Sequence, residues 1–188
     1  MTLHRVRIIG GEWRSRIVSF PPHEGLRPTP DRVRETLFNW LGQDLAGQSC
    51  LDLFAGSGVL GFEAISRGAA QAVLVDKERD VFKALQQSAK KLDADRILVV
   101  CSDALSYLRR EKTKFDVIFF DPPYGSVVFD DYLPLLGVRM SDDAVVYFES
   151  NRAITLARGW RAIRQKRAGQ VHFALARRVA KPALGSAV

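Results

Sequence analysis

The 188-residue chain has few of the residues that mark disulfide-rich, metal-binding or membrane-spanning proteins. It contains two cysteines, Cys50 and Cys101, both within apolar strand-like runs, which predicts buried thiols in a reducing cytosol. The three histidines (His4, His23 and His172) are scattered without metal-ligand spacing, so we expect no metal site. No apolar run approaches the roughly 20 residues that span a membrane. The N-terminal segment also lacks a signal-peptide core, so we predict a cytoplasmic protein with no membrane partner.

Acidic residues are outnumbered: 21 Asp and Glu stand against 28 Lys and Arg, a formal charge of +7. Such a balance suits a polyanionic partner, with nucleic acid the leading candidate, although a merely basic globular protein has the same composition. The length and the 47% hydrophobic content are those of one globular domain with a small extension.

Internal repeats are absent, and strand-like and helix-like segments alternate along the chain. We predict strands at 49–54, 72–76, 97–101, 115–120 and 144–150, and helices at 31–45, 58–67, 79–92, 104–110 and 129–136. The first helix is expected to have Thr29 as its N-cap and Pro30 at its first helical position. Short βαβ units predict an α/β fold: a mostly parallel sheet covered by helices on both faces. Two final strands joined near Gly169 are expected at an antiparallel edge.

Two short strand-like runs within residues 5–20, around Gly10 and Gly11, predict a β-hairpin. We therefore divide the chain into a hairpin extension with its loop (1–26), a sheet domain (27–180) and a flexible tail (181–188). Basic and aromatic side chains of the hairpin suit phosphate contact and base stacking, although a solvated charged hairpin is the alternative. These candidate RNA-binding residues are Arg5, Arg7, Trp13, Arg14 and Arg16.

Acidic residues follow three successive predicted strands. Asp52 leads into FAGSG, where Gly56 and Gly58 allow a tight turn and a close ligand approach, and no lysine follows as a phosphate loop requires. Asp76 ends the next strand, where a carboxylate can accept hydrogen bonds from ribose hydroxyls. Asp103 follows the third strand, although it suits a helix N-cap equally well. Together they predict a site for an adenosine-containing ligand with a cationic centre.

The fourth predicted strand ends in DPPYG (121–125). Asp121 and the Pro122 carbonyl, held rigid by Pro123, offer two acceptors that can draw the hydrogens of a nucleobase amino group. The nitrogen lone pair then points at an electrophile, as methyl transfer requires. Tyr124 can stack on the base, a contact of about 1–3 kcal/mol. The alternative is a plain strand break with a packed tyrosine.

DLFAGSG followed by DPPY resembles the signature of S-adenosylmethionine-dependent amino-methyltransferases. With RPTPDRVRETLFNWL before these motifs and FESNR after them, the chain is similar over about residues 5–178 to bacterial small-subunit rRNA guanine-N2 methyltransferases of the RsmD type. The resemblance implies a Rossmann-like class I methyltransferase sheet, mostly parallel with the last strand antiparallel, and an N-terminal β-hairpin extension. It implies transfer from S-adenosyl-L-methionine to a guanine N2 in 16S rRNA, guanine 966 by resemblance. The expected enzyme is a monomer acting on a small-subunit particle.

The resemblance also implies roles for individual residues. Binding of S-adenosylmethionine is implied for Asp52, Phe54, Gly56, Gly58, Asp76, Lys77, Asp103 and Ala104, and for Arg27, Thr29 and Arg32 in a segment that closes over its methionine end. Catalysis is implied for Asp121, Pro122, Pro123 and Tyr124, the last of which is often Phe in the family.

Three other functions remain open from the residues. A DNA adenine-N6 or cytosine-N4 amino-methyltransferase shares DPPY, and a non-catalytic RNA-binding protein or a small-molecule methyltransferase has the same scaffold. The segments 58–121 and 125–188 are taken up by predicted core elements, which leaves no segment to read a DNA sequence. That favours a substrate recognised by shape, such as folded rRNA. The intact FAGSG and DPPY argue against loss of catalysis.

Overall fold

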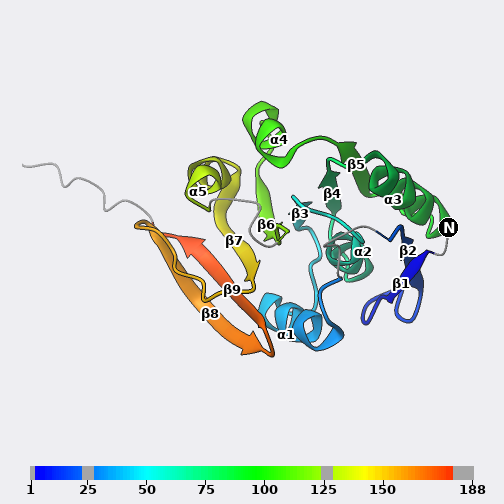
Figure 1. Cartoon of the computed structure of the whole chain (residues 1–188), viewed down its shortest axis with the longest axis horizontal. Coiled ribbons are helices and arrows are strands. Elements are labelled where there is room, and N and C mark those ends of the chain that lie inside the picture. Colours follow the sequence, from blue (N-terminus) through cyan, green and yellow to red (C-terminus); the bar gives the residue numbers. More distant parts are fainter. Residues whose placement is uncertain (1–2, 23–27, 124–128, 180–188) are drawn as a thin grey trace, which may run out of the picture.

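The computed structural model describes residues 3–22, 28–123 and 129–179, and within them a seven-stranded sheet has the order β5-β4-β3-β6-β7-β9-β8 (Figure 1). Neighbours from β5 to β7 pair in parallel, whereas β9 runs antiparallel to both β7 and β8. This confirms the predicted, mostly parallel Rossmann-like sheet with a reversed last strand. The strands are β3 (Ser49–Asp52), β4 (Gln71–Asp76), β5 (Ile97–Cys101), β6 (Phe115–Phe120), β7 (Met140–Ser150), β8 (Trp160–Ala168) and β9 (Val171–Arg178).

Helices cover both faces of the sheet, as Figure 1 shows. Successive side chains of a strand point to opposite faces, so Phe119 and Phe120 of β6 belong to two different apolar clusters. Phe119 packs in the cluster of the first three helices, and Phe120 in the cluster of the last two. The first three are α1 (Asp31–Leu41), α2 (Val59–Ser66) and α3 (Arg79–Lys91); the last two are α4 (Ala104–Arg110) and α5 (Phe129–Val138).

The predicted N-terminal hairpin is confirmed and consists of β1 (His4–Arg7) and β2 (Ile17–Phe20). Its buried Val18 and Phe20 join the same apolar cluster as α1, α2 and α3. The Ser88 hydroxyl of α3 also donates to the Ser19 carbonyl at 3.3 Å. Figure 1 shows this hairpin and the β8–β9 hairpin at opposite ends of the molecule.

Three local predictions were wrong. The first helix ends at Leu41 because Gly42 adopts a left-handed φ of 102°, so it does not extend to residue 45. Pro30, not Thr29, directly precedes that helix, and no side chain caps it. Cys101 is exposed because β5 is an edge strand, whereas burial raises the pKa of Cys50 to about 12. Within the described residues, no helix is long and apolar enough to cross a membrane.

Candidate active site

Four acidic residues lie at one edge of the sheet, where the parallel strands β3 to β6 end. Asp52 and Asp76 are the last residues of β3 and β4, Asp103 follows β5, and Asp121 follows β6. The chain runs outward from β3 through β4 to β5. It then returns to the other side of β3, where β6 and β7 lie. The strand order therefore reverses between β3 and β6, the position at which open α/β sheets bind ligands. Asp52 and Asp121 flank this switch point.

A glycine turn follows Asp52 and contacts Asp76. Gly56 and Gly58 have φ values of 49° and 74°, the left-handed region that glycine adopts without strain. A Cβ on Gly58 would lie only 2.4 Å from the Leu85 side chain. The Gly56 N–H donates to Asp76 Oδ2 at 2.9 Å, and the Glu78 N–H donates to Asp76 Oδ1 at 2.9 Å. The Asp76 carboxylate is thus held in one orientation at the end of β4.

The Asp52 carboxyl is almost fully buried, with 2% of its surface exposed. Burial raises its pKa to about 7, the nearby charge of Asp76 adds to the rise, and backbone N–H groups of Gly61 and Phe54 oppose it. A cation brought beside this carboxyl would stabilise its anionic form. The site therefore suits a ligand that carries positive charge, as the sulfonium centre of S-adenosylmethionine does.

Asp121, Thr29 and Glu149 form a second group on the other side of the switch point. The Thr29 hydroxyl donates to Asp121 Oδ2 at 3.3 Å, and the Tyr147 hydroxyl donates to Glu149 Oε2 at 2.6 Å. Burial raises the pKa of Asp121 well above its usual range, and the charges of Glu149 and Asp52 raise it further against the Thr29 hydrogen bond. Burial also raises the pKa of Glu149, with Tyr147 and Thr29 opposing. These two carboxyls retain protons to a higher pH than ordinary acids.

Sequence reasoning assigned no role to Glu149, although FESNR contributed to the family resemblance. The usable signal was its position: β7 pairs in parallel with β6, with Phe148 opposite Phe120. An acidic residue that follows Phe148 therefore lies next to Asp121 at the same sheet edge.

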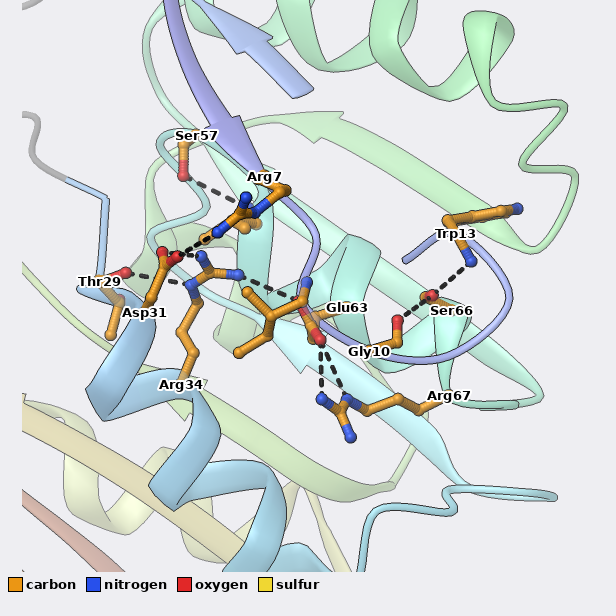
Figure 2. Close-up of polar contacts among 12 residues, drawn as sticks. Arg7, Gly10, Trp13, Thr29, Asp31, Arg34, Ser57, Glu63, Ser66 and Arg67 are labelled. Carbon is orange, nitrogen blue, oxygen red and sulfur yellow. Dashed lines mark hydrogen bonds and ion pairs between the residues drawn. The ribbon is translucent and has the colours of Figure 1, made fainter. Parts of the chain in front are cut away.

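Arg34 holds Thr29 in place through a buried network that sequence reasoning also missed (Figure 2). Its Nε donates to the Thr29 carbonyl at 3.1 Å, and its Nη1 donates to Glu63 Oε2 at 3.0 Å. Both ionic side chains are fully buried. Glu63 also accepts from the Arg67 guanidinium at 2.9 Å and from the Ile9 N–H at 3.0 Å. One carboxylate thereby connects the N-terminal hairpin and α2 to the segment that contacts Asp121. The signal in the sequence was an arginine on the apolar face of α1.

Residues 6–177 match the family model described as conserved hypothetical protein 95. The chain belongs to this family. The ribosomal RNA small subunit methyltransferase D of Escherichia coli K12 is 43% identical over 182 residues, which cover 94% of this chain and 92% of that protein. The protein of the same name from Haemophilus influenzae is 35% identical and covers 90% and 92%. The predicted RsmD-type methyltransferase family is thereby confirmed.

Solved structures agree with this family assignment. A structure described as a putative methyltransferase from Escherichia coli has a TM-score of 0.84 and 43% identity, covering 95% of this chain and all of that one. A putative methylase from Haemophilus influenzae has a TM-score of 0.78 and 32% identity, covering 94% and 100%.

The other residues that the family resemblance singled out are dispersed around the sheet edge. Phe54 packs its ring against Phe120 at 5.4 Å between centroids, and Ala104 is buried. Asp103 accepts from the Ser106 N–H at 2.9 Å and caps α4, so the N-cap alternative is realised. Lys77 is exposed and lies 3.7 Å from Glu78.

The remaining family positions lie nearer to β6 or outside the described chain. Pro122 is buried and Pro123 is exposed. Arg32 is exposed, and its Nη2 would lie 3.0 Å from a Cβ on Gly169 in the β8–β9 turn. Tyr124 and Arg27 lie outside the described residues. Within that described part, no three His, Cys, Asp or Glu side chains are grouped as metal ligands.

The predicted RNA-binding residues of the N-terminal hairpin have different surroundings. Trp13 is only 6% exposed and packs in the core, so the prediction that its ring stacks on RNA needs correction. Its backbone N–H donates to Ser66 Oγ at 2.8 Å. Arg7 lies 3.5 Å from Asp31 in an exposed ion pair. The other three arginines are exposed: Arg5, Arg14 and Arg16.

Proposed function

We propose that the protein transfers a methyl group from S-adenosyl-L-methionine to the N2 amino group of a guanine in small-subunit rRNA. The observation that carries this proposal is the meeting of Asp52 and Asp121 across the switch point of an RsmD-type sheet. Relatives named ribosomal RNA small subunit methyltransferase D support rRNA as the substrate. By resemblance the nucleotide is guanine 966 of 16S rRNA.

The residues at the ends of β3 and β4 fit the cofactor. S-adenosylmethionine supplies, when bound, an electrophilic methyl group on a cationic sulfur. The glycine turn at Gly56 and Gly58 lets the main chain approach a ligand, and the oriented Asp76 carboxylate suits the two ribose hydroxyls. Asp52 offers the buried carboxyl whose anionic form a positively charged ligand stabilises.

Asp121 acts on the guanine amino group. The N2 lone pair is delocalised into the ring, so the nitrogen becomes nucleophilic only when acceptors draw its two hydrogens out of the ring plane. Asp121 and the Pro122 carbonyl are two such acceptors, fixed by the end of β6 and by proline. Because its pKa is raised, the Asp121 carboxylate is also a stronger base than an ordinary aspartate and can take the proton that nitrogen loses.

Replacement of Asp121 by Asn tests this role. We expect methyl transfer to fall by about 10²–10⁴-fold, the usual contribution of a positioned acid or base, while binding of S-adenosylmethionine measured by calorimetry is retained. The matched control is Asp142→Asn, which alters an exposed aspartate near the opposite edge of the sheet and leaves the rate unchanged. Loss of cofactor binding with transfer would show instead that Asp121 is part of the cofactor site.

The substrate is tested by offering labelled S-adenosylmethionine with unmethylated small subunits, deproteinised 16S rRNA and duplex DNA. Label in a guanine of rRNA is the expected result, and nuclease digestion followed by chromatography identifies the N2 position. Label confined to DNA would overturn the rRNA proposal, and label in none of the three would favour a non-catalytic RNA-binding protein.

A further inference from the structure

The positive charge of the chain lies at one end of the sequence. All 21 acidic residues fall within residues 1–149, which hold 19 of the 28 basic residues and are therefore slightly acidic. Residues 150–188 contain the other nine basic residues and no Asp or Glu. The whole excess of +7 thus comes from the segment that includes β8 and β9.

Four of these cations lie on one face of the β8–β9 hairpin. Side chains that pair directly across antiparallel strands share a face. The pairs are Arg161 with Arg177, Arg164 with Leu175, and Lys166 with Phe173. The Phe173 ring stacks on Trp40 of α1 at 5.2 Å, which identifies this face as the one on the α1 side.

A bulge keeps Arg161 and Arg164 on the same face. Residues three apart in a regular strand point to opposite faces, but the register of β8 shifts between Ala162 and Arg164. Arg161, Arg164 and Lys166 therefore form a single row about 14 Å long, at about 3.4 Å per residue. We call Arg161, Arg164, Lys166 and Arg177 the hairpin cation row.

The cation row is exposed and has no counter-charge among the described residues. All four side chains are exposed, and none makes an ion pair with a carboxylate of the described chain. Arg161 and Arg177 even pair directly across strands, an arrangement of like charges that costs stability. Charges on an edge strand such as β8 prevent aggregation, but either sign serves that purpose. The absence of any acidic residue therefore needs another explanation.

The cation row begins near the candidate active site. β9 runs antiparallel to β7, with Phe173 opposite Glu149 and His172 opposite Ser150. The β8–β9 turn thus lies at the sheet edge where Asp121 and Glu149 lie. Lys166 is the member of the row nearest that edge, and β8 is three strands from β6, about 14 Å away.

We propose that the hairpin cation row binds the phosphate backbone of the RNA whose base enters the active site. This inference rests on the proposed function, because it assigns the same substrate a second contact surface. Phosphates repeat along a strand, so a row of cations matches them without reading bases, and each neutralised phosphate releases counterions. An anion between Arg161 and Arg177 also relieves their repulsion.

The test compares two variants that each lose three positive charges. In one, Arg161, Arg164 and Lys166 are replaced by Gln; in the control, the exposed Lys83, Lys90 and Lys91 of α3, beside the β5 edge, are replaced by Gln. Binding of in vitro transcribed 16S rRNA is measured by filter retention over a salt series. We expect the plot of log affinity against log salt to lose about 2–3 units of slope in the β8 variant, at about 0.7–0.9 per phosphate contact. The α3 control is expected to keep most or all of the wild-type slope.

Two further measurements separate possible failures. The unfolding midpoint of the β8 variant is expected to match or exceed that of the wild type, because a like-charge pair is removed, so weaker binding is not a folding defect. Equal slopes for the β8 variant and the wild type, or equal losses in both triple variants, would overturn the cation row as the binding surface. Methyl transfer to rRNA by the wild type is measured in a separate assay. Absence of transfer would overturn the proposed function, whereas the salt slopes test only whether the cation row binds RNA.

Discussion

The two β-hairpins of this protein look alike in sequence and are used differently in the structure. Both are antiparallel and rich in arginine, and they lie at opposite ends of the molecule (Figure 1). The N-terminal hairpin directs its loop into the body of the protein, where Glu63 and Ser66 bind it. The C-terminal hairpin joins the sheet through β9 only and leaves β8 and its cations at the edge.

The difference teaches that buried carboxylates, not the number of arginines, decide how firmly a basic hairpin is held to the body of the protein. Near the N-terminal hairpin, Arg7 meets Asp31, and the buried Arg34 and Arg67 share Glu63. Beside the C-terminal hairpin, no described carboxylate pairs with the cations of β8. Buried carboxylate contacts therefore anchor the first hairpin to the fold, although three of its four arginines are exposed and make no ion pair with a described carboxylate. The second hairpin has no such anchor for its β8 cations.

The largest expected effect comes from removing the charge that anchors the N-terminal hairpin. Glu63→Gln leaves the buried Arg34 and Arg67 without their shared anion, and breaking a buried ion pair in this way costs about 3–5 kcal/mol. The measurement is the free energy of unfolding in urea. Lys166→Gln, the corresponding loss of a charge from the other hairpin, should change it by less than about 0.5 kcal/mol.

A control separates anchoring from general loss of acidity. Glu12→Gln removes an exposed carboxylate from the loop of the same hairpin, and its unfolding free energy should equal that of the wild type. If Glu63→Gln and Glu12→Gln were equally stable, the buried network would not anchor the hairpin, and the contrast between the two hairpins would be lost.

A smaller effect is expected at the contact of the hairpin loop with α2. Ser66 Oγ accepts from the Trp13 N–H at 2.8 Å and donates to the Gly10 carbonyl at 2.6 Å. Ser66→Ala leaves the buried N–H unsatisfied, at about 1–3 kcal/mol. Cleavage by trypsin after Arg14 and Arg16 should also accelerate, because the loop opens more often.

The matched control is Ser106→Ala on the exposed surface of α4. It should leave both the unfolding free energy and the rate of cleavage near those of the wild type. Faster cleavage of Ser66→Ala without a change in its unfolding free energy would show that Ser66 stabilises the loop locally. An unchanged cleavage pattern would contradict the role of Ser66.

Much of the fold was predictable because periodicity and strand-ending motifs are local signals. The strand at 115–120 and the helix at 104–110 were predicted with the bounds that β6 and α4 have. Helix α1 was predicted too long, because the left-handed Gly42 ended it before the later Gly47. Trp13 was misjudged because an aromatic residue among arginines looks exposed, whereas the loop folds back onto α2.

The candidate site was predictable where a residue ends a strand and unpredictable where partners come from distant segments. Asp52, Asp76 and Asp121 follow apolar runs, so their shared sheet edge could be inferred. Arg34 and Glu63 are 29 residues apart, and no local pattern in either segment predicts their buried contact. The β8 bulge that aligns the cation row likewise depends on the register with β9, which the sequence pattern alone does not specify.

The smallest expected effect concerns the buried carboxylate beside the C-terminal hairpin. Glu149 pairs in register with Phe173 of β9, and unlike Glu63 it has no ion pair with a described cation. Burial raises its pKa in the folded state. The folded protein therefore binds the Glu149 proton more tightly than the unfolded chain, so stability declines as pH rises above the usual glutamate value of about 4.3. Glu149→Gln removes this decline, which cannot exceed about 1.4 kcal/mol per pH unit for one group.

The check is the unfolding free energy in urea of wild type and Glu149→Gln from mildly acidic to neutral pH. The wild type should lose more stability than the variant over that range. The decline that remains in the variant comes from Asp52 and from Asp121, whose pKa stays raised by burial but loses the contribution of the Glu149 charge. Glu111→Gln is a control with a pKa shift of opposite sign, because backbone hydrogen bonds lower the pKa of Glu111 to about 2. The stability that Glu111 contributes is therefore lost only at acidic pH. Parallel curves of stability against pH for wild type and Glu149→Gln would mean that the Glu149 carboxylate is stabilised by its surroundings as well as that of Glu63. The two hairpins would then differ only in their surface charge.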